Sequence, residues 1–279
     1  MTTTRIFILT LLAMAAFAGN SLLCRAALRG MTIDAASFTA IRIVSGAVVL
    51  WLILRLRGRS ALNAGSWWSA LALFIYAAAF SFAYLSLSAG TGALLLFAAV
   101  QATMILWGVR RRERLHVRQV AGLALAFMGL VLLLLPGIAA PPVGGSFLML
   151  AAGVAWGAYS LRGKGVGDAA AATAGNFIRA VPMALLAAVV LLPQAHADRA
   201  GVTYAIISGA ITSGLGYVIW YAVLPGLKAV SAASVQLSVP VLTAVAGIVF
   251  LGEAVSLRLV IAALAVLGGI ALVVLERRS

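Results

Sequence analysis

Two arginines, Arg42 and Arg179, are the most conspicuous candidates for chemistry in this sequence. Each follows an isoleucine near the middle of a long apolar stretch that carries no other charge. In a membrane-spanning helix, a central arginine costs about 2.5–3.5 kcal/mol on insertion scales, so an idle one is not expected. The carboxylate of a bound solute would satisfy such a group, and so would backbone carbonyls at a helix break. Both interpretations fit the sequence.

Aromatic residues recur at helical spacing in other stretches. Tyr76, Phe80 and Tyr84 follow one another at intervals of four, which places them on one face of a helix. Further candidates are Phe17, Asn20, Ser21, Trp156, Tyr159, Ser213, Tyr217, Trp220 and Tyr221. If these faces line one cavity, it would be aromatic with a few hydroxyls and amides, and would suit a flat amphipathic solute. Packing between helices explains the same pattern for Tyr76 and Tyr217.

Polar side chains within the apolar stretches complete the candidate set. Such groups cost energy in hydrocarbon, so they usually face protein or water, either lining a cavity or bonding between helices. The predicted substrate-binding residues are Asn20, Arg42, Tyr76, Phe80, Gln101, Trp156, Tyr159, Asn176, Arg179, Tyr217 and Gln236. Pro182 and Pro240 lie inside apolar stretches and are predicted hinges, because proline frees backbone carbonyls and permits a kink.

Catalysis and metal binding lack suitable residues at depth. An intramembrane enzyme would need an acid, base, nucleophile or metal site there. The acids Asp34, Glu113, Asp168, Asp198, Glu253 and Glu276 lie at or beyond the ends of the apolar stretches, and His116 and His196 lie in or beside loops. The single cysteine, Cys24, excludes an internal disulfide or a thiolate metal cage. We therefore expect no enzymatic activity, no cofactor and no metal.

Composition indicates that lipid is the solvent of this chain. Apolar residues make up 64% and charged residues 9%, far outside the range of soluble domains. The net charge of +14 comes from basic residues that punctuate apolar runs, without a basic and aromatic surface for nucleic acid. We expect an all-α integral membrane protein that does not bind nucleic acid.

Ten membrane-spanning helices are predicted from the lengths of the apolar runs. They cover about 5–24, 35–54, 66–87, 89–108, 117–136, 145–162, 171–192, 201–223, 229–250 and 257–275. A proline- and glycine-rich run from Pro136 to Gly145 separates two units of five helices, 1–137 and 143–279.

The two units repeat one another. At a constant offset of 140 positions, the matching pairs are Glu113/Glu253, Arg118/Arg258, Val120/Val260, Gly129/Gly269 and Leu132/Leu272. Such self-similarity over half the chain indicates a duplicated structural unit. The recurrence of Glu113 and Glu253 just before a helix needs only a structural role, because a helix N-terminus and basic neighbours both favour a carboxylate.

Charge counting predicts the orientation. With a cytosolic N-terminus, fourteen basic residues lie in inner loops or at inner span ends, against four at the outer side, Arg25, Arg29, Arg199 and Arg258. This positive-inside bias places both termini in the cytosol. The basic cluster at Arg110–Arg114 is expected to contact anionic lipid headgroups.

Five helices per unit is an odd number, so the second unit must enter the membrane upside down. Inverted repeats are a recurring device of secondary transporters, in which two similar halves rock about a site near the midplane. We therefore expect a central cavity between the halves and alternating access. A channel remains the alternative from a different class.

The arrangement resembles the EamA family of the drug/metabolite transporter superfamily. The resemblance rests on two five-helix halves, an arginine in the second helix of each half, and the segment Leu251-Gly-Glu253 followed by Gly268-Gly269. The first half departs from the pattern, with Arg112 where Gly252 stands in the second. The resemblance implies that helices one to four and six to nine surround the cavity, while five and ten stand outside.

A weaker similarity to bacterial exporters of aromatic amino acids (the YddG type) implies a substrate class. The expected function is export of small amphipathic metabolites, amino acids including aromatic ones. Drug-like cations and nucleotide-type metabolites are the alternative substrates.

Overall fold

The computed structural model describes residues 3–61, 64–111, 116–137, 140–163, 166–223 and 235–275. These residues form helices joined by short loops, with one isolated β-bridge between Ile33 and Ala197. The first half contains α1 (Thr3–Arg29), α2 (Ala35–Leu56), α3 (Trp67–Tyr84), α4 (Ala89–Arg110) and α5 (Val117–Leu134). The second half contains α6 (Val143–Gly163), α7 (Ala169–Val190), the short η1 (Leu192–Gln194), α8 (Arg199–Ile207), η2 (Ser208–Leu215), α9 (Gly216–Val223), α11 (Ser238–Leu251) and α12 (Leu257–Leu275).

Within these described residues, eight helical segments are long and apolar enough to cross a membrane, and α11 and α12 are shorter apolar helices. Elements α8, η2 and α9 form one of the eight, from Arg199 to Val223. The predicted ninth span, 229–250, begins outside the described residues, and α11 covers its second part. The prediction of an all-helical, multi-pass architecture is confirmed.

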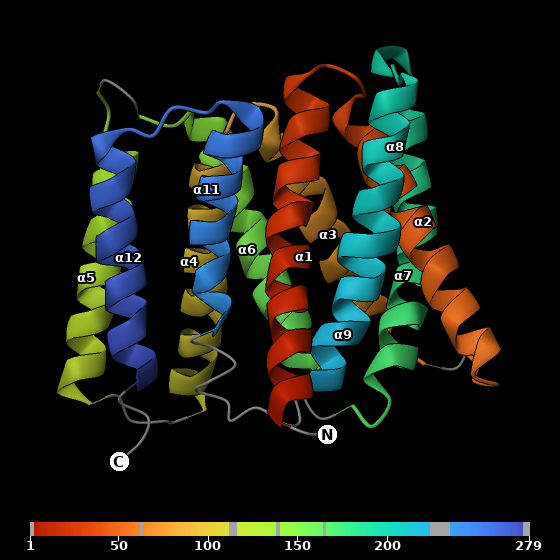
Figure 1. Cartoon of the computed structure of the whole chain (residues 1–279), viewed down its shortest axis with the longest axis horizontal. Coiled ribbons are helices and arrows are strands. Elements are labelled where there is room, and N and C mark those ends of the chain that lie inside the picture. The colour runs from red at the N-terminus through yellow and green to blue at the C-terminus, as the bar shows by residue number, and fades with distance from the viewer. Residues whose placement is uncertain are drawn as a thin grey trace.

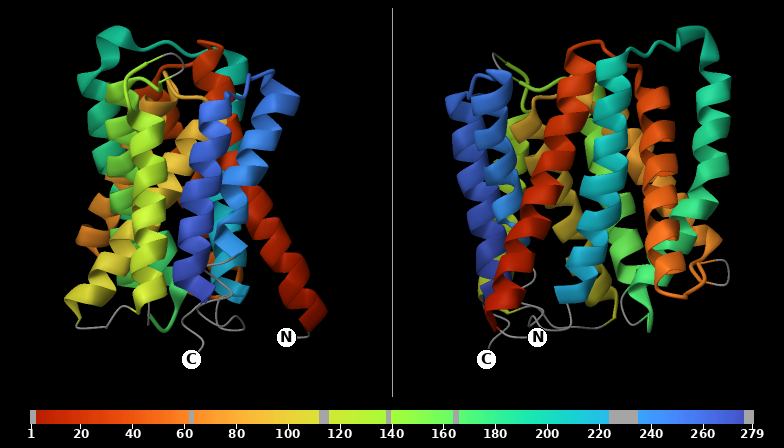
Figure 2. Two further views of the ribbon diagram at one scale, coloured as in Figure 1. Left: turned by 90° about the vertical axis from the view of Figure 1, so that its left-hand side faces the viewer. Right: turned by 45° about the vertical axis from the view of Figure 1, so that its right-hand side comes forward.

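The helices stand side by side as a bundle (Figure 1). Helix α1 begins and α12 ends at the same end of the bundle, which we call the base; the opposite end is the top (Figures 1 and 2). Helix α1 runs from base to top, whereas α6, which opens the second half, runs from top to base. The two halves thus begin with helices of opposite direction.

Helices α5 and α12 pack against each other at one edge of the bundle (Figure 1). Glycines allow the two backbones to meet: a Cβ built on Gly269 would lie 2.4 Å from the carbonyl oxygen of Gly122, and one on Gly122 would lie 2.5 Å from that of Gly269. Small residues commonly mediate such close approach in membranes. Gly129, the counterpart of Gly269 in the repeat, lies in the same contact, against Ala262 and Ala265.

Short polar residues begin several helices, as their types predict. Asp34, Asp168 and Asp198 each accept a hydrogen bond from the first turn of α2, α7 and α8. Ser66 and Ser88 do the same for α3 and α4. These caps satisfy amide groups that have no partner within their own helix.

Aromatic and basic residues gather at the base. Trp51, Trp67, Trp68 and Trp107 are all exposed there, and the guanidinium groups of Arg55 and Arg111 lie over the rings of Trp51 and Trp107. Tryptophan is enriched where a bilayer meets water. This distribution agrees with an interfacial belt at the base.

Candidate functional site

A small cavity lies between the two halves of the chain, about midway along the helices. It has a volume of about 20 Å³. A buried water needs a cavity volume of roughly 10–15 Å³. In this conformation the cavity therefore has room for one water molecule but is too small for an amino acid. The lining residues are Phe17, Asn20, Ser21, Tyr76, Phe80, Leu96, Phe97, Trp156, Thr212 and Tyr217. They come from α1, α3, α4, α6, η2 and α9, and include five of the predicted binding residues: Asn20, Tyr76, Phe80, Trp156 and Tyr217.

Trp156 of α6 is the centre of the aromatic cluster. Its ring centroid lies 4.8 Å from that of Tyr76, 4.9 Å from that of Tyr217 and 5.4 Å from that of Tyr159. Tyr76 comes from the first half, whereas the other rings come from the second. The cluster therefore joins the halves through ring contacts, each typically worth about 0.5–1.5 kcal/mol beyond area burial.

Asn20 of α1 is hydrogen-bonded to both halves. Its amide nitrogen donates to the hydroxyl of Tyr76 at 3.3 Å. Its oxygen accepts hydrogen bonds from Ser208 at 2.8 Å and Thr212 at 3.3 Å. All of the amide's assigned bonds are thus made to side chains that line or adjoin the cavity.

Arg42 of α2 adjoins the cavity through Tyr76. Its Nε donates to the hydroxyl of Ser213 at 3.2 Å, and one terminal nitrogen donates to the hydroxyl of Tyr76 at 3.1 Å. The guanidinium carbon lies 5.2 Å from the ring centroid of Tyr76 and 5.0 Å from that of Phe80, which is a cation–π geometry. The side chain is 2% exposed.

The eighth span contains a feature that the sequence analysis missed. Its middle, Ser208–Leu215, is π-helical, and such wide turns are frequent at functional sites. Three hydroxyl residues of this segment, Ser208, Thr212 and Ser213, bond to Asn20 or Arg42. A Cβ on Gly209 would lie 2.1 Å from the carbonyl oxygen of Arg42, so glycine is required where the segment meets α2. The span is rich in glycine and hydroxyl residues, but this composition does not by itself specify a π-helical turn.

Arg179, the repeat counterpart of Arg42, lies in the middle of α7 and has different neighbours. It donates to the backbone carbonyls of Ala64 and Gly175. Neighbouring Asn176 accepts a hydrogen bond from the amide of Ser66 at 2.8 Å and donates to Tyr159 at 3.5 Å. These contacts fasten the segment before α3 to α7, and none of the three predicted residues Tyr159, Asn176 and Arg179 is among those lining the cavity.

The remaining predicted residues are also placed away from the cavity lining. Gln101 is buried on α4, and Gln236 is half-buried just before α11. Pro182 lies within α7, which continues through it to Val190. Pro240 lies in the first turn of α11, three residues after a turn at Leu237 that separates α11 from the helical residues Val235 and Gln236. Its ring interrupts the regular helical hydrogen bonding at this point.

A partly buried ion pair joins the two halves at the top of the bundle. Gly252 ends α11 with a φ of 60°, a conformation that favours glycine, and turns the chain so that Glu253 faces α1. One carboxylate oxygen lies 2.9 Å from Nε of Arg25, and the other accepts a hydrogen bond from the amide of Ala89 at 2.7 Å. Arg25 also donates to the carbonyl of Tyr84. Glu253 therefore caps α4 of the other half, while Glu113 lies outside the described residues.

A second contact at the top joins the loop after α1 to the loop after α7. The amide of Asp34 donates to the carbonyl of His196, whose amide donates to the Asp34 carboxylate at 3.1 Å. Burial acts to raise the pKa of Asp34, but hydrogen bonds from the amides of Ser37, His196 and Ala36 outweigh it and hold the pKa below its ordinary value. The carboxylate is thus ionised at neutral pH, as these contacts need.

At the base, the corresponding contact between halves is more exposed. Arg59 pairs with Asp168 at 3.0 Å, with side chains 60% and 38% exposed, against 13% and 9% for Arg25 and Glu253. Arg162 donates to the hydroxyl of Ser69 at 3.1 Å. An exposed pair contributes little, about 0–1 kcal/mol, so this ion pair holds the base less firmly than the Arg25–Glu253 pair holds the top.

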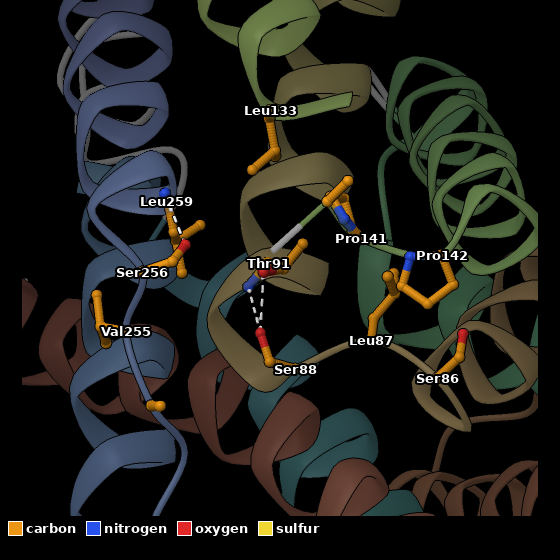
Figure 3. Close-up of a pocket in the computed structure, with 12 residues that line it drawn as sticks. Ser86, Leu87, Ser88, Thr91, Leu133, Pro141, Pro142, Val255, Ser256 and Leu259 are labelled. Atoms are coloured by element: carbon orange, nitrogen blue, oxygen red, sulfur yellow. Dashed lines mark hydrogen bonds between the residues drawn. The ribbon is translucent and has the colours of Figure 1, made fainter. Parts of the chain in front are cut away.

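A larger pocket of about 340 Å³ lies at the top, between the start of α4, the end of α5 and the start of α12 (Figure 3). Serine and threonine hydroxyls alternate with apolar side chains on its wall. Ser88 bonds to Thr91, and the Ser256 hydroxyl accepts from the amide of Leu259, so these hydroxyls are already engaged in helix starts. The pocket is separate from the residues around Arg42.

Comparison with known proteins agrees with this architecture. The chain is 57% identical over 274 residues to the Pseudomonas aeruginosa protein described as "Uncharacterized protein PA1977", covering 98% of this chain and 96% of that protein. It also superposes on a solved crystal structure with a TM-score of 0.68 and 20% identity, over 97% of this chain and 99% of that one, which shows a shared fold. The model of the EamA-like transporter family matches twice, at residues 4–135 and 143–275. The chain belongs to the EamA-like transporter family, as its resemblance predicted.

Proposed function

We propose that the protein is a secondary transporter of the bacterial inner membrane that exports small amphipathic metabolites, amino acids including aromatic ones, by alternating access. The observation that carries this proposal is the central cavity, whose wall combines the rings of Tyr76, Trp156 and Tyr217 with the amide of Asn20. Aromatic walls with a few fixed polar groups suit a flat solute that has one polar end.

The transport cycle follows from contacts between two inverted repeats, residues 1–137 and 143–279. The cavity is too small for a substrate in the present conformation, and both ends of the bundle are held by contacts between the halves. In an alternating cycle, the halves would rock so that the Arg25–Glu253 contact breaks when the top opens, and the Arg59–Asp168 contact when the base opens. Of the two ion pairs, the more exposed Arg59–Asp168 pair would break more readily.

The proposed orientation places the base in the cytosol. Among described residues, Arg5, Arg55, Arg57, Arg59, Arg110, Arg111 and Arg162 lie at the base. Together with the exposed tryptophans there, this charge would meet the anionic headgroups of the inner leaflet. Substrate would then enter from the base and leave at the top.

Proton coupling is not part of the proposal. A proton-coupled carrier commonly holds an acid or a histidine within a span. The described carboxylates all lie at helix ends: Asp34, Asp168, Asp198 and Glu253. His116 and His196 likewise lie at helix ends or in loops. The transporter is therefore expected to move substrate down its own gradient, as a facilitator or exchanger.

Counterflow in proteoliposomes tests the proposal. Vesicles loaded with unlabelled phenylalanine, leucine or threonine should accumulate the labelled amino acid transiently and saturably, and a protonophore should leave the rate unchanged. An organic cation, loaded and labelled in the same way, serves as the comparison substrate. Absence of counterflow with every amino acid would contradict the proposed substrate class. Flux that does not saturate would indicate a channel, and loss of accumulation with the protonophore would indicate proton coupling.

A further inference from the structure

Arg42 is a buried cation with spare hydrogen-bonding capacity. Its side chain is 2% exposed and bonds to two neutral hydroxyls, those of Ser213 and Tyr76. Its remaining terminal nitrogen, NH1, is buried without a hydrogen-bond partner. Arginine cannot shed its proton in a protein, so this charge persists.

The carboxylates in the described part of the chain are engaged elsewhere. Glu253 pairs with Arg25, and Asp168 pairs with Arg59. Asp34 and Asp198 accept backbone hydrogen bonds at the starts of α2 and α8. None of these four therefore neutralises Arg42, and buried charges are ordinarily paired. A cation of this kind beside a cavity is suited to an anion that comes from outside the protein.

Arg179 shows what a structurally satisfied arginine looks like in the same fold. It occupies the matching position in the second half, after an isoleucine, and its guanidinium donates to the backbone carbonyls of Ala64 and Gly175. The two arginines therefore differ in their neighbours: Arg179 donates to two backbone carbonyls, whereas Arg42 contacts two aromatic rings and two hydroxyls.

We propose that Arg42 receives the carboxylate of the transported solute, so that the central site selects carboxylate-bearing aromatic solutes and rejects organic cations. This inference rests on the proposed function and names the chemistry of its site. Tyr76 separates Arg42 from the cavity, and its hydroxyl accepts from both Arg42 and Asn20. Movement of Tyr76 would present two guanidinium nitrogens to the cavity, the geometry that binds a carboxylate with paired hydrogen bonds.

The same charge explains why a cation would be excluded. The cavity is lined by aromatic, apolar, amide and hydroxyl groups, with no carboxylate among its described lining residues. In such a water-poor site, the repulsion between Arg42 and an ammonium group is screened far less than in water. An amino acid avoids this penalty because its carboxylate pairs with Arg42, while its ammonium can rest against ring faces and the Asn20 oxygen.

Three probes with one ring and different charges test the inference by binding. They are phenylalanine, 3-phenylpropionate and 2-phenylethylamine, each added to the purified full-length protein while its melting temperature is measured. We expect stabilisation by both carboxylates and none by the amine. In Arg42→Ala, the concentration of either carboxylate that gives half-maximal stabilisation should rise about ten- to hundredfold, as for loss of a hydrogen bond between charged groups. Arg42→Lys, which keeps the charge, should show a smaller rise.

Arg179→Lys is the matched control, because it alters the repeat-related arginine. It should change the melting temperature without changing the order of the three probes. The inference would be overturned if the amine stabilised the protein as strongly as the carboxylates do. It would also be overturned if neither carboxylate stabilised the protein. If Arg42→Ala does not fold, the probe order in wild type and Arg42→Lys decides.

Transport and binding can fail separately. Carboxylate binding without counterflow of any amino acid would refute the proposed export function and leave the role of Arg42 standing. Counterflow of phenylalanine that 2-phenylethylamine inhibits as well as 3-phenylpropionate does would refute the role of Arg42 and leave export standing.

Discussion

Replacing Glu253 with glutamine is expected to destabilise the folded protein by about 2–4 kcal/mol, between the small cost of breaking an exposed ion pair and the cost of breaking a fully buried one from one side. The change would leave the partly buried Arg25 without its carboxylate and would weaken the bond to the amide of Ala89. Arg25→Gln should cost a similar amount. Thermal unfolding of the purified protein in detergent, followed by its melting temperature, measures the loss.

The exposed pair at the base provides the control. Arg59→Gln removes an ion pair whose side chains are 60% and 38% exposed, and should change stability by less than about 1 kcal/mol. The double variant Arg25→Gln/Glu253→Gln should lose less stability than the sum of the losses in the two single variants. In each single variant one charge remains without its partner, whereas in the double variant both charges are absent. Strict additivity, or equal losses for Glu253→Gln and Arg59→Gln, would mean that the pair at the top does not hold the halves together.

Substituting alanine for Gly269 is expected to force α5 and α12 apart. A Cβ at this position would lie 2.4 Å from the carbonyl oxygen of Gly122 and 2.6 Å from the amide nitrogen of Ala126, which are backbone atoms that cannot yield without moving a helix. Overpacking of this kind costs about 1–3 kcal/mol. The melting temperature of the purified protein should fall accordingly.

The adjacent glycine is a matched control on the same helix. A Cβ on Gly268 would meet nothing within 4 Å, so Gly268→Ala should be neutral or should stabilise by up to about 1 kcal/mol through helix propensity. Equal effects at the two positions would show that α5 and α12 do not meet through Gly269.

Much of the fold could be predicted from the sequence because the bilayer imposes simple rules. Apolar runs of fixed length gave the helices, and the repeat gave two similar halves, which the double family match also shows. The π-helical segment could not be predicted, because its geometry depends on the close contact between Gly209 and α2 and on hydroxyl bonds to Asn20 and Arg42. Tertiary contacts of that kind leave no periodic signal in a sequence.

The candidate site could likewise be predicted from the sequence only in part. Helical spacing gathered Tyr76 and Phe80 on one face, and both line the central cavity. Spacing could not distinguish Arg42 from Arg179, because both follow an isoleucine inside an apolar run. Their neighbours distinguish them: Arg179 donates to two backbone carbonyls, while Arg42 lies among rings and hydroxyls. Likewise, the sequence placed Glu253 before its own helix, whereas its carboxylate caps α4.

Access to the central cavity from both sides of the membrane is the property that defines the proposed transporter. Cys24 is the single cysteine, so Cys24→Ser yields a chain without thiols, and Ser21→Cys then places one thiol on the cavity wall. Labelling of this thiol by a membrane-impermeant maleimide should be measured from each side of oriented vesicles, with and without phenylalanine. Alternating access predicts labelling from either side and protection by phenylalanine on both. A thiol that reacts from one side alone, with no protection by phenylalanine, would contradict a central site that opens alternately.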